Sequence, residues 1–354
     1  MTHCPAAFAI PGDLDTITGG YIYEKHLLEG LRAEGHDVHY IRLGASYPDP
    51  TPTDLTHAID ALCAVNPERV LILDGFVSGA TETEGLAQVR ALMVAMVHHP
   101  LALESGLSDA RKAHLYKTER DNLALMEHVL VPSPHTAALL TEQYNVAPER
   151  ITIARPGTRR PLGQSKRIDP PLILSVGLLH PRKGHDVLLQ ALARIKGQEW
   201  KAVIVGAPHD PDHARALADL RNTLGLQDRV HFAGRIPQDE LDALYRQASI
   251  FALATRFEGY GIVFDEALAC GLPIVTCRTG AVPDTVPPEA GRLVPPGEAE
   301  PFAAALSDLL TDDITRTRMA AASQRAADRL ATWADTARIA SAVLNDIAKR
   351  RTSG

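Results

Sequence analysis

Short apolar runs alternate along the whole chain with longer segments whose apolar residues recur at helical spacing. Brief apolar runs bounded by glycine, proline or polar residues are typical of buried strands, and amphipathic helices between them connect parallel strands. The pattern therefore predicts an α/β fold that is built from βαβ units.

The predicted strands fall into two sets. The first set is 6–10, 36–43, 69–75, 91–97, 128–133 and 151–155; the second is 172–177, 201–206, 230–234, 250–255, 273–277 and 291–296. Between the sets, residues 154–171 (ARPGTRRPLGQSKRIDPP) are rich in proline, glycine and basic side chains, a composition that indicates a linker. A chain of 354 residues is also longer than one hydrophobic core usually fills. We therefore expect two doubly wound domains, each with a parallel sheet.

The composition argues against a nucleic-acid-binding function. Acidic residues outnumber basic ones by 43 to 36, and only 5% of residues are aromatic, so neither a basic surface nor a base-stacking surface for nucleic acid is indicated. The four cysteines, Cys4, Cys63, Cys270 and Cys277, form no CxxC motif. The N-terminus lacks a signal-peptide pattern, and no apolar run is long enough to span a bilayer. We expect a cytoplasmic protein, with peripheral contact at the inner membrane face left open.

The stretch FEGYGIVFDEALACGLPIV, residues 257–275, carries the most specific chemistry. It predicts a loop that contains Glu258 and a short helix that contains Glu266 in its first turn, closed by a glycine and a proline. A glycine-rich loop that feeds a helix N-terminus favours an anion, whereas two carboxylates favour hydroxyl groups. A sugar nucleotide carries both an anionic diphosphate and many hydroxyl groups.

Three other features follow predicted strands, where ligands of open α/β sheets bind. Gly19 and Gly20 are expected just before a helix, the pair His98 and His99 ends a strand, and Arg182 and Lys183 precede another helix. The two basic residues favour phosphate binding. The acidic residues at Asp74 and at 210–212 lack a convincing context for a metal site, so we expect no metal and no other cofactor.

These motifs resemble those of retaining glycosyltransferases of family 4. Glu258 and Glu266 match the E-x7-E signature, PRKG at 181–184 is similar to the phosphate-binding motif, and TGG at 18–20 is similar to the glycine-rich loop. The resemblance covers nearly the whole chain and is strongest from residue 172 onward. It implies the GT-B fold, in which two Rossmann-like domains face across a cleft.

The resemblance also implies domain roles. Residues 1–160 would bind the acceptor, residues 161–332 would bind the nucleotide sugar, and the helix in 333–354 would cross back to the N-terminal domain. The implied reaction is transfer of a sugar from a UDP-, GDP- or ADP-sugar to an acceptor hydroxyl, with retention and without a metal.

The same resemblance implies roles for individual residues. Glu266 would bind the ribose, and Glu258 would contact the donor sugar or support its anomeric centre. Lys183, Arg182 and His98 complete the expected catalytic set, with either His98 or His99 touching the sugar. The remaining expected contacts, to base, phosphates and sugar, are Gly19, Gly20, Tyr21, Gly177, Arg235, Ile236, Gly259, Tyr260, Gly261, Ile262 and Val263.

Some alternatives stay open. Leu178 stands where many family members have arginine, and Arg182 is expected to supply that charge. A phosphorylase-like enzyme with a pyridoxal phosphate lysine, a sugar-nucleotide epimerase and a noncatalytic nucleotide-sugar-binding subunit would share the architecture. The acceptor, a small molecule, a glycan or a lipid, and the oligomeric state are not predicted. The basic residues of 108–130, among them Arg111 and Lys117, indicate a solvated helix face or an anionic-acceptor or headgroup site.

Overall fold

The chain folds into two compact units. A computed structural model describes residues 3–160 and 166–353. One unit comprises Met1–Gly157 and Ala331–Gly354, and the other comprises Thr158–Leu330. The boundaries expected from sequence, after residues 160 and 332, therefore lie slightly beyond these divisions. The middle of the expected linker, residues 161–165, lies outside the described residues.

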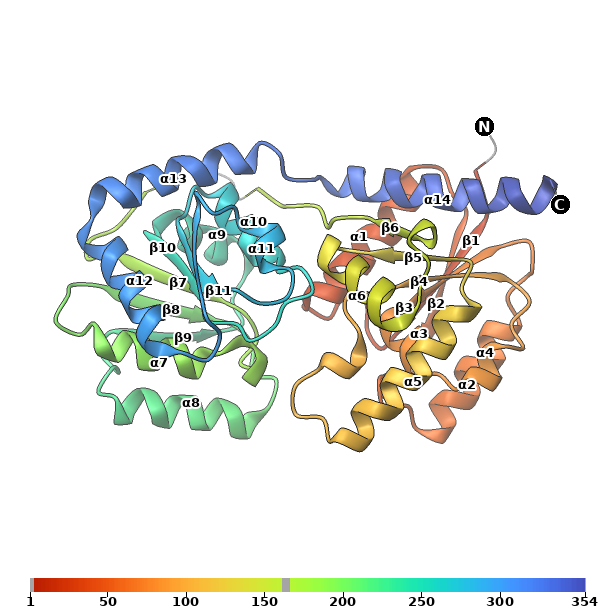
Figure 1. The fold of residues 1–354 in the computed structure, drawn as a ribbon, viewed down its shortest axis with the longest axis horizontal. Coiled ribbons are helices and arrows are strands. Elements are labelled where there is room, and N and C mark those ends of the chain that lie inside the picture. Colours follow the sequence, from red (N-terminus) through yellow and green to blue (C-terminus); the bar gives the residue numbers. More distant parts are fainter. Residues whose placement is uncertain (1–2, 161–165, 354) are drawn as a thin grey trace. The chain divides into compact units, whose positions relative to one another are not determined.

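The first unit is built on one parallel sheet of six strands (Figure 1). Along the sheet the strands follow the order β2-β1-β3-β4-β5-β6. Their bounds are β1 Ala6–Pro11, β2 Val38–Leu43, β3 Val70–Asp74, β4 Leu92–Met96, β5 His128–Val131 and β6 Ile151–Ile153. Because the order reverses between β1 and β3, the carboxyl ends of these two strands flank a topological switch point, where ligands of such sheets bind.

Helices cover both faces of this sheet. They are α1 Gly19–Ala33, α2 Pro52–Cys63, α3 Gly75–Ala80, α4 Thr83–Leu86, α5 Asp109–Leu125, α6 Pro134–Tyr144 and α14 Trp333–Ser353, with short 3₁₀ turns at Leu101–Leu103 and Pro148–Arg150. Side chains alternate along β1, so that Phe8 packs in the core beneath α1 and α14 and Ala9 packs in the core beneath α2 and α6. The two faces therefore have separate hydrophobic cores.

The C-terminal helix α14 belongs to the first unit, where it packs beside α1 (Figure 1). Polar contacts fix its position: Ser341 Oγ lies 2.7 Å from His36 Nε2, and Asn345 Oδ1 accepts from the backbone N–H of Cys4 at 3.2 Å. Trp333, at the start of α14, stacks on His26 with 4.4 Å between ring centroids. The tail of the chain is thus a structural part of the N-terminal sheet domain.

The second unit repeats the architecture with a different strand order. Its parallel strands run β12-β11-β10-β7-β8-β9, which places the switch point between β7 and β10. The strands are β7 Leu172–Val176, β8 Lys201–Val205, β9 Val230–Gly234, β10 Ile250–Leu253, β11 Ile274–Cys277 and β12 Gly291–Val294. The helices are α7 His185–Arg194, α8 Pro211–Thr223, α9 Gln238–Gln247, α10 Ile262–Ala269, α11 Val282–Thr285, α12 Ala299–Thr311 and α13 Asp313–Ala327, with a 3₁₀ turn, η3, at Pro181–Lys183.

Two cores also sandwich this second sheet. Ile250 and Ala252 of β10 pack with α7, α8 and α12, whereas Phe251 and Leu253 pack with α9 and α10. All the predicted strand segments coincide with strands, and the predicted α/β class with two doubly wound parallel sheets is confirmed. No helix in residues 3–160 or 166–353 is long and apolar enough to cross a membrane.

Candidate functional site

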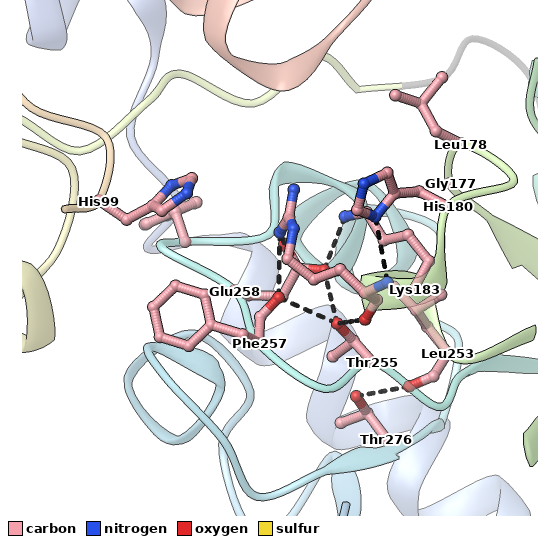
Figure 2. A network of polar contacts seen from close by, with 12 residues as sticks. His99, Gly177, Leu178, His180, Lys183, Leu253, Thr255, Phe257, Glu258 and Thr276 are labelled. Atoms are coloured by element: carbon pink, nitrogen blue, oxygen red, sulfur yellow. Dashed lines mark hydrogen bonds and ion pairs between the residues drawn. The ribbon is translucent and has the colours of Figure 1, made fainter. Parts of the chain in front are cut away.

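A cluster of charged side chains lies at the switch point of the second unit. The segment after β7 carries Arg182 and Lys183, and the segment after β10 carries Glu258. Lys183 Nζ lies 2.6 Å from Glu258 Oε1 (Figure 2). Arg182 Nη1 lies 3.5 Å from Glu258 Oε2. Parallel strands bring their carboxyl ends to one sheet edge, which is why residues 75 positions apart in sequence meet here.

Glu258 is held in its ionised form. It is 4% exposed, so burial opposes ionisation, but the charges of Lys183 and Arg182 outweigh this effect and lower the pKa of the carboxyl. Thr255 Oγ1 also donates to Glu258 Oε1 at 3.0 Å. Nothing in the sequence singled out Thr255, because a threonine that ends a strand is common.

The backbone around this cluster depends on one glycine. Gly184 has a φ of +64°, and a Cβ at this position would collide with the carbonyl oxygen of Ala254. Behind it, the buried ring of His185 donates from Nε2 toward the carbonyls of Gly177 and Leu178, each at 3.2 Å. The loop between β7 and α7 is therefore closely packed on both sides before any ligand arrives.

Glu266 lies further along, on α10. It is the fifth residue of that helix, so the expectation that it occupies the first turn was wrong; α10 begins at Ile262, with Gly261 at its N-cap. Gly261 has a φ of +91°, and a Cβ there would lie 2.6 Å from the ring of Phe264. Glu266 Oε2 accepts from Tyr245 Oη at 2.8 Å, and burial raises the pKa of its carboxyl.

The other residues that were expected to bind substrate in this unit lie on three segments of the chain. Gly261, Ile262 and Val263 form the start of α10, whose first N–H groups have no acceptor within the helix. Arg235 and Ile236 follow β9. Tyr260 is buried, and its hydroxyl donates to Asp265 at 2.6 Å, so this hydroxyl has a partner within the unit. Gly259 lies between Glu258 and Tyr260, and Gly177 follows β7 directly.

At the first unit's switch point, the glycines Gly19 and Gly20 form the first residues of α1 instead of preceding it, because Thr18 is the N-cap and accepts from Tyr21 N. A Cβ on Gly20 would lie 3.5 Å from the ring of His98. Tyr21 Oη donates to the carbonyl of Pro11 at 2.9 Å. These residues thus gather where β1 ends.

The two histidines after β4 have different surroundings. His99 Nε2 lies 2.6 Å from Glu104 Oε1, whereas His98 Nε2 lies 3.5 Å from Glu24 Oε1. Glu24 is buried on α1 and adjoins Asp74 at the end of β3. In the described part of the chain, these three residues, Glu24, Asp74 and His98, form a cluster of potential ligand atoms that all lie within 4.8 Å of one another. Sequence reading did not connect them.

The basic helix of the first unit is α5. Lys117 and Arg120 both pair with Asp121, and Arg111 pairs with Asp49. These partners neutralise much of the positive charge that was considered for an anionic acceptor, which favours the interpretation of a solvated helix face.

The second unit matches a known protein family. Residues 162–326 match the family model described as glycosyl transferases group 1. The second unit carries a group 1 glycosyl transferase domain. The sites around Lys183, Glu258 and Glu266 lie inside the matched segment of that domain.

Curated relatives resemble part of the chain. A D-inositol 3-phosphate glycosyltransferase of Corynebacterium glutamicum is 34% identical over 232 residues, which cover 58% of this chain and 54% of that protein. A GDP-mannose-dependent alpha-(1-6)-phosphatidylinositol monomannoside mannosyltransferase of Mycolicibacterium smegmatis is 33% identical over 177 residues, or 47% of this chain and 44% of that protein. The matched segment thus spans about half the length of these relatives.

Solved structures resemble the whole fold. A sucrose-phosphate synthase from Thermosynechococcus elongatus has a TM-score of 0.82 at 23% identity and covers 97% of this chain and 99% of its own. The Anabaena protein HepE, solved with UDP and glucose, has a TM-score of 0.75 at 16% identity and covers 97% of this chain and 100% of its own. The group 1 domain therefore belongs to a GT-B fold with two Rossmann-like domains.

Proposed function

We propose that this chain is a retaining glycosyltransferase that moves a sugar from a nucleotide-diphosphate donor to an acceptor hydroxyl without a metal ion. The observation that carries the proposal is the cluster at the switch point of the group 1 domain, in which the partly buried Lys183 and Arg182 pair with the buried Glu258. It combines cations suited to a diphosphate with a carboxylate suited to a sugar hydroxyl.

The chemistry follows from where charge develops. Breaking the bond between sugar and phosphate leaves negative charge on the departing diphosphate, and cations that are already in place lower the energy of that state. Lys183 and Arg182 supply this charge, and the N–H groups at the start of α10 supply dipoles. Glu258 then accepts hydrogen bonds from the donor sugar, and Glu266 accepts them from the ribose.

Retention of configuration fits front-face attack, because the proposal gives no side chain the role of nucleophile. In that scheme the departing phosphate takes the proton of the acceptor hydroxyl, while the hydroxyl oxygen bonds to the anomeric carbon on the face that the phosphate leaves. The protein binds and orients both substrates and offsets the developing charge.

The names of the relatives guide the choice of substrates. We propose UDP-, GDP- and ADP-sugars as donors, and inositol phosphates and phosphoinositides as the first acceptors to test, since similar proteins carry these names. A thermal-shift screen would first identify the nucleotide, because a ligand at a concentration of 100 times its Kd adds about 2.7 kcal/mol of stability.

The decisive experiment is transfer by the purified chain, with the configuration of the product read by NMR. An α-linked product from an α-linked donor supports the proposal, and an inverted product contradicts it. Conversion of the donor to an epimeric sugar nucleotide without an acceptor would indicate an epimerase. Tight nucleotide-sugar binding with neither transfer nor hydrolysis would indicate a noncatalytic binding subunit.

A further inference from the structure

Three polar side chains converge at the switch point of the first unit without a role in the scheme above. Glu24 comes from the second turn of α1, Asp74 is the last residue of β3, and His98 follows β4. Glu24 is 1% exposed and Asp74 is 4% exposed. Buried carboxyl groups are rare unless they are neutralised by a proton, a cation or a basic side chain.

The two carboxyl groups of Glu24 and Asp74 lie next to each other. The side chains of Glu24 and Asp74 present oxygens that lie within 4.8 Å of one another. Asp74 Oδ1 accepts from the N–H groups of Phe76 at 2.8 Å and Val77 at 3.3 Å. Two ionised carboxylates so close together and so deeply buried would repel each other, and one proton between them removes that repulsion. Within the described residues, no lysine or arginine forms an ion pair with either group.

The electrostatics of the site agree with this geometry. Burial raises the pKa of Glu24 to about 7 and raises the pKa of Asp74 well above its usual range, where the charge of Glu24 adds to the effect. The pair of adjacent carboxyls resembles other dyads in that its protons leave in two coupled steps. One proton therefore stays on the pair near neutral pH.

His98 is the third member of the arrangement. Its Nε2 and Glu24 Oε1 are both buried without a hydrogen-bond partner, and they face each other at 3.5 Å. Tyr23 packs edge-on against the imidazole with 5.3 Å between ring centroids, and Gly20 lies on the Nε2 side of the ring. Burial lowers the pKa of His98, so the ring is neutral.

We propose that Glu24 and Asp74 share one buried proton and together act as positioning residues for a neutral His98. The inference rests on the proposed function in so far as the resemblance implies that His98 touches the donor sugar. A shared proton keeps the pair at a single negative charge, and loss of that proton at alkaline pH places a second charge against the imidazole.

Other titratable groups face the pair from the surrounding elements. They are the phenols of Tyr21 and Tyr23 on α1 and of Tyr40 on β2, all with raised pKa values that hold them neutral through the neutral range. Burial is the main cause in each phenol. The charge at the site therefore changes with pH through ionisation of the Glu24–Asp74 pair.

Infrared spectroscopy of the full chain detects the proton directly. We expect a carboxylic-acid carbonyl band of the pair at neutral pH, beside that of Glu119, and Glu24→Gln should remove only the band of the pair, because Asp74 then accepts from two N–H groups and ionises. In Asp74→Asn the band should shift, because the partner of the Glu24 carboxyl has changed. Glu119→Gln is the matched control: Glu119 is also buried, burial raises its pKa to about 8, and its substitution should leave the band of the pair unchanged.

Kinetics test the positioning role. In the wild type, kcat/KM should fall at alkaline pH as the pair loses its proton, and this limb should move or vanish in Glu24→Gln. An unchanged pH profile in that variant would overturn the positioning role. A carboxylic-acid band that Glu24→Gln leaves unchanged, or a stoichiometric divalent cation in the purified protein, would overturn the shared proton. If the chain transfers no sugar at all, the proposed function fails, and the infrared result alone decides whether the proton is shared.

Discussion

Lys183 Nζ and Glu258 Oε1 lie 2.6 Å apart at the carboxyl edge of the second sheet, and their side chains are only 15% and 5% exposed. Such a buried ion pair is weak evidence of stability, because desolvation offsets much of the attraction between the charges. Its value lies in placing a lysine ammonium and a carboxylate in fixed positions before a substrate binds.

The first prediction concerns that ammonium group. Lys183→Ala should lower kcat by roughly 100-fold or more, because a preorganised cation no longer offsets charge on the departing phosphate. Steady-state kinetics with the identified donor would measure the effect. Lys201→Ala, which removes an exposed lysine of β8 in the same unit, is the matched control and should retain activity. A folded Lys183→Ala protein with near-normal turnover would contradict the phosphate role.

The second prediction concerns metals. Treatment with EDTA should leave the rate of transfer unchanged, because the proposed mechanism uses cationic side chains and N–H dipoles where other enzymes use Mg²⁺. The measurement is the initial rate before and after chelation, with and without added Mg²⁺ or Mn²⁺. A complete loss of activity that either ion restores would contradict metal independence and would direct attention to Glu24, Asp74 and His98.

The third prediction links pH to stability through His185. This ring is fully buried, and burial lowers its pKa from 6.5 to about 4. Between these values the unfolded chain binds a proton that the folded chain does not, so stability falls as pH decreases. From about pH 7 to about pH 5 the loss due to His185 should be about 2 kcal/mol.

Urea unfolding of the second unit measures this effect. Trp200 is buried in that unit and Trp333 belongs to the other, so a Trp333→Phe background restricts the fluorescence signal to the second unit. His185→Gln should lose about 2 kcal/mol less than its parent over the same pH interval. His114→Gln, which replaces an exposed histidine of α5, should behave like the parent. Equal pH dependence in His185→Gln and its parent would show that the pKa of this ring is the same in the folded and the unfolded chain.

The strands of the fold could be predicted from the sequence more readily than the side-chain clusters of the site. Apolar runs such as that of β7 predicted the strands correctly, because a strand buried on both faces needs a nearly continuous apolar sequence. The start of α1 was misplaced by the glycine signal at Gly19, since the capping hydroxyl of Thr18 sets that boundary.

Side-chain clusters were harder to predict. The resemblance gave Glu258 and Lys183 roles around one donor, whereas their direct pairing follows from the strand order of the second sheet. The meeting of Glu24, Asp74 and His98 depends on how α1 is rotated against its sheet. The sequence of an amphipathic helix with a single acidic residue does not show that rotation. Thr255 likewise acquires its role only through the distance to Glu258.

The last prediction separates the two glutamates of the E-x7-E stretch. If Glu266 binds the ribose, Glu266→Ala should weaken binding of the free nucleoside diphosphate, with no sugar attached. Loss of a hydrogen bond to a charged acceptor typically costs about 1.5–3 kcal/mol, or roughly 10- to 150-fold in affinity. If Glu258 faces the sugar, Glu258→Ala should leave this affinity nearly unchanged and lower kcat with the intact donor.

Calorimetric titration of both variants with nucleotide, paired with steady-state kinetics, measures the two effects. Tyr245→Phe is the matched control for Glu266, because it removes the hydroxyl that donates to Oε2 and keeps the carboxylate. Its loss of nucleotide affinity should be smaller than that of Glu266→Ala. Equal losses in the two glutamate variants would show that the division of roles is wrong. If neither substitution changed binding or turnover, the nucleotide-sugar site would lie elsewhere, and the glycosyltransferase proposal would lose its main support.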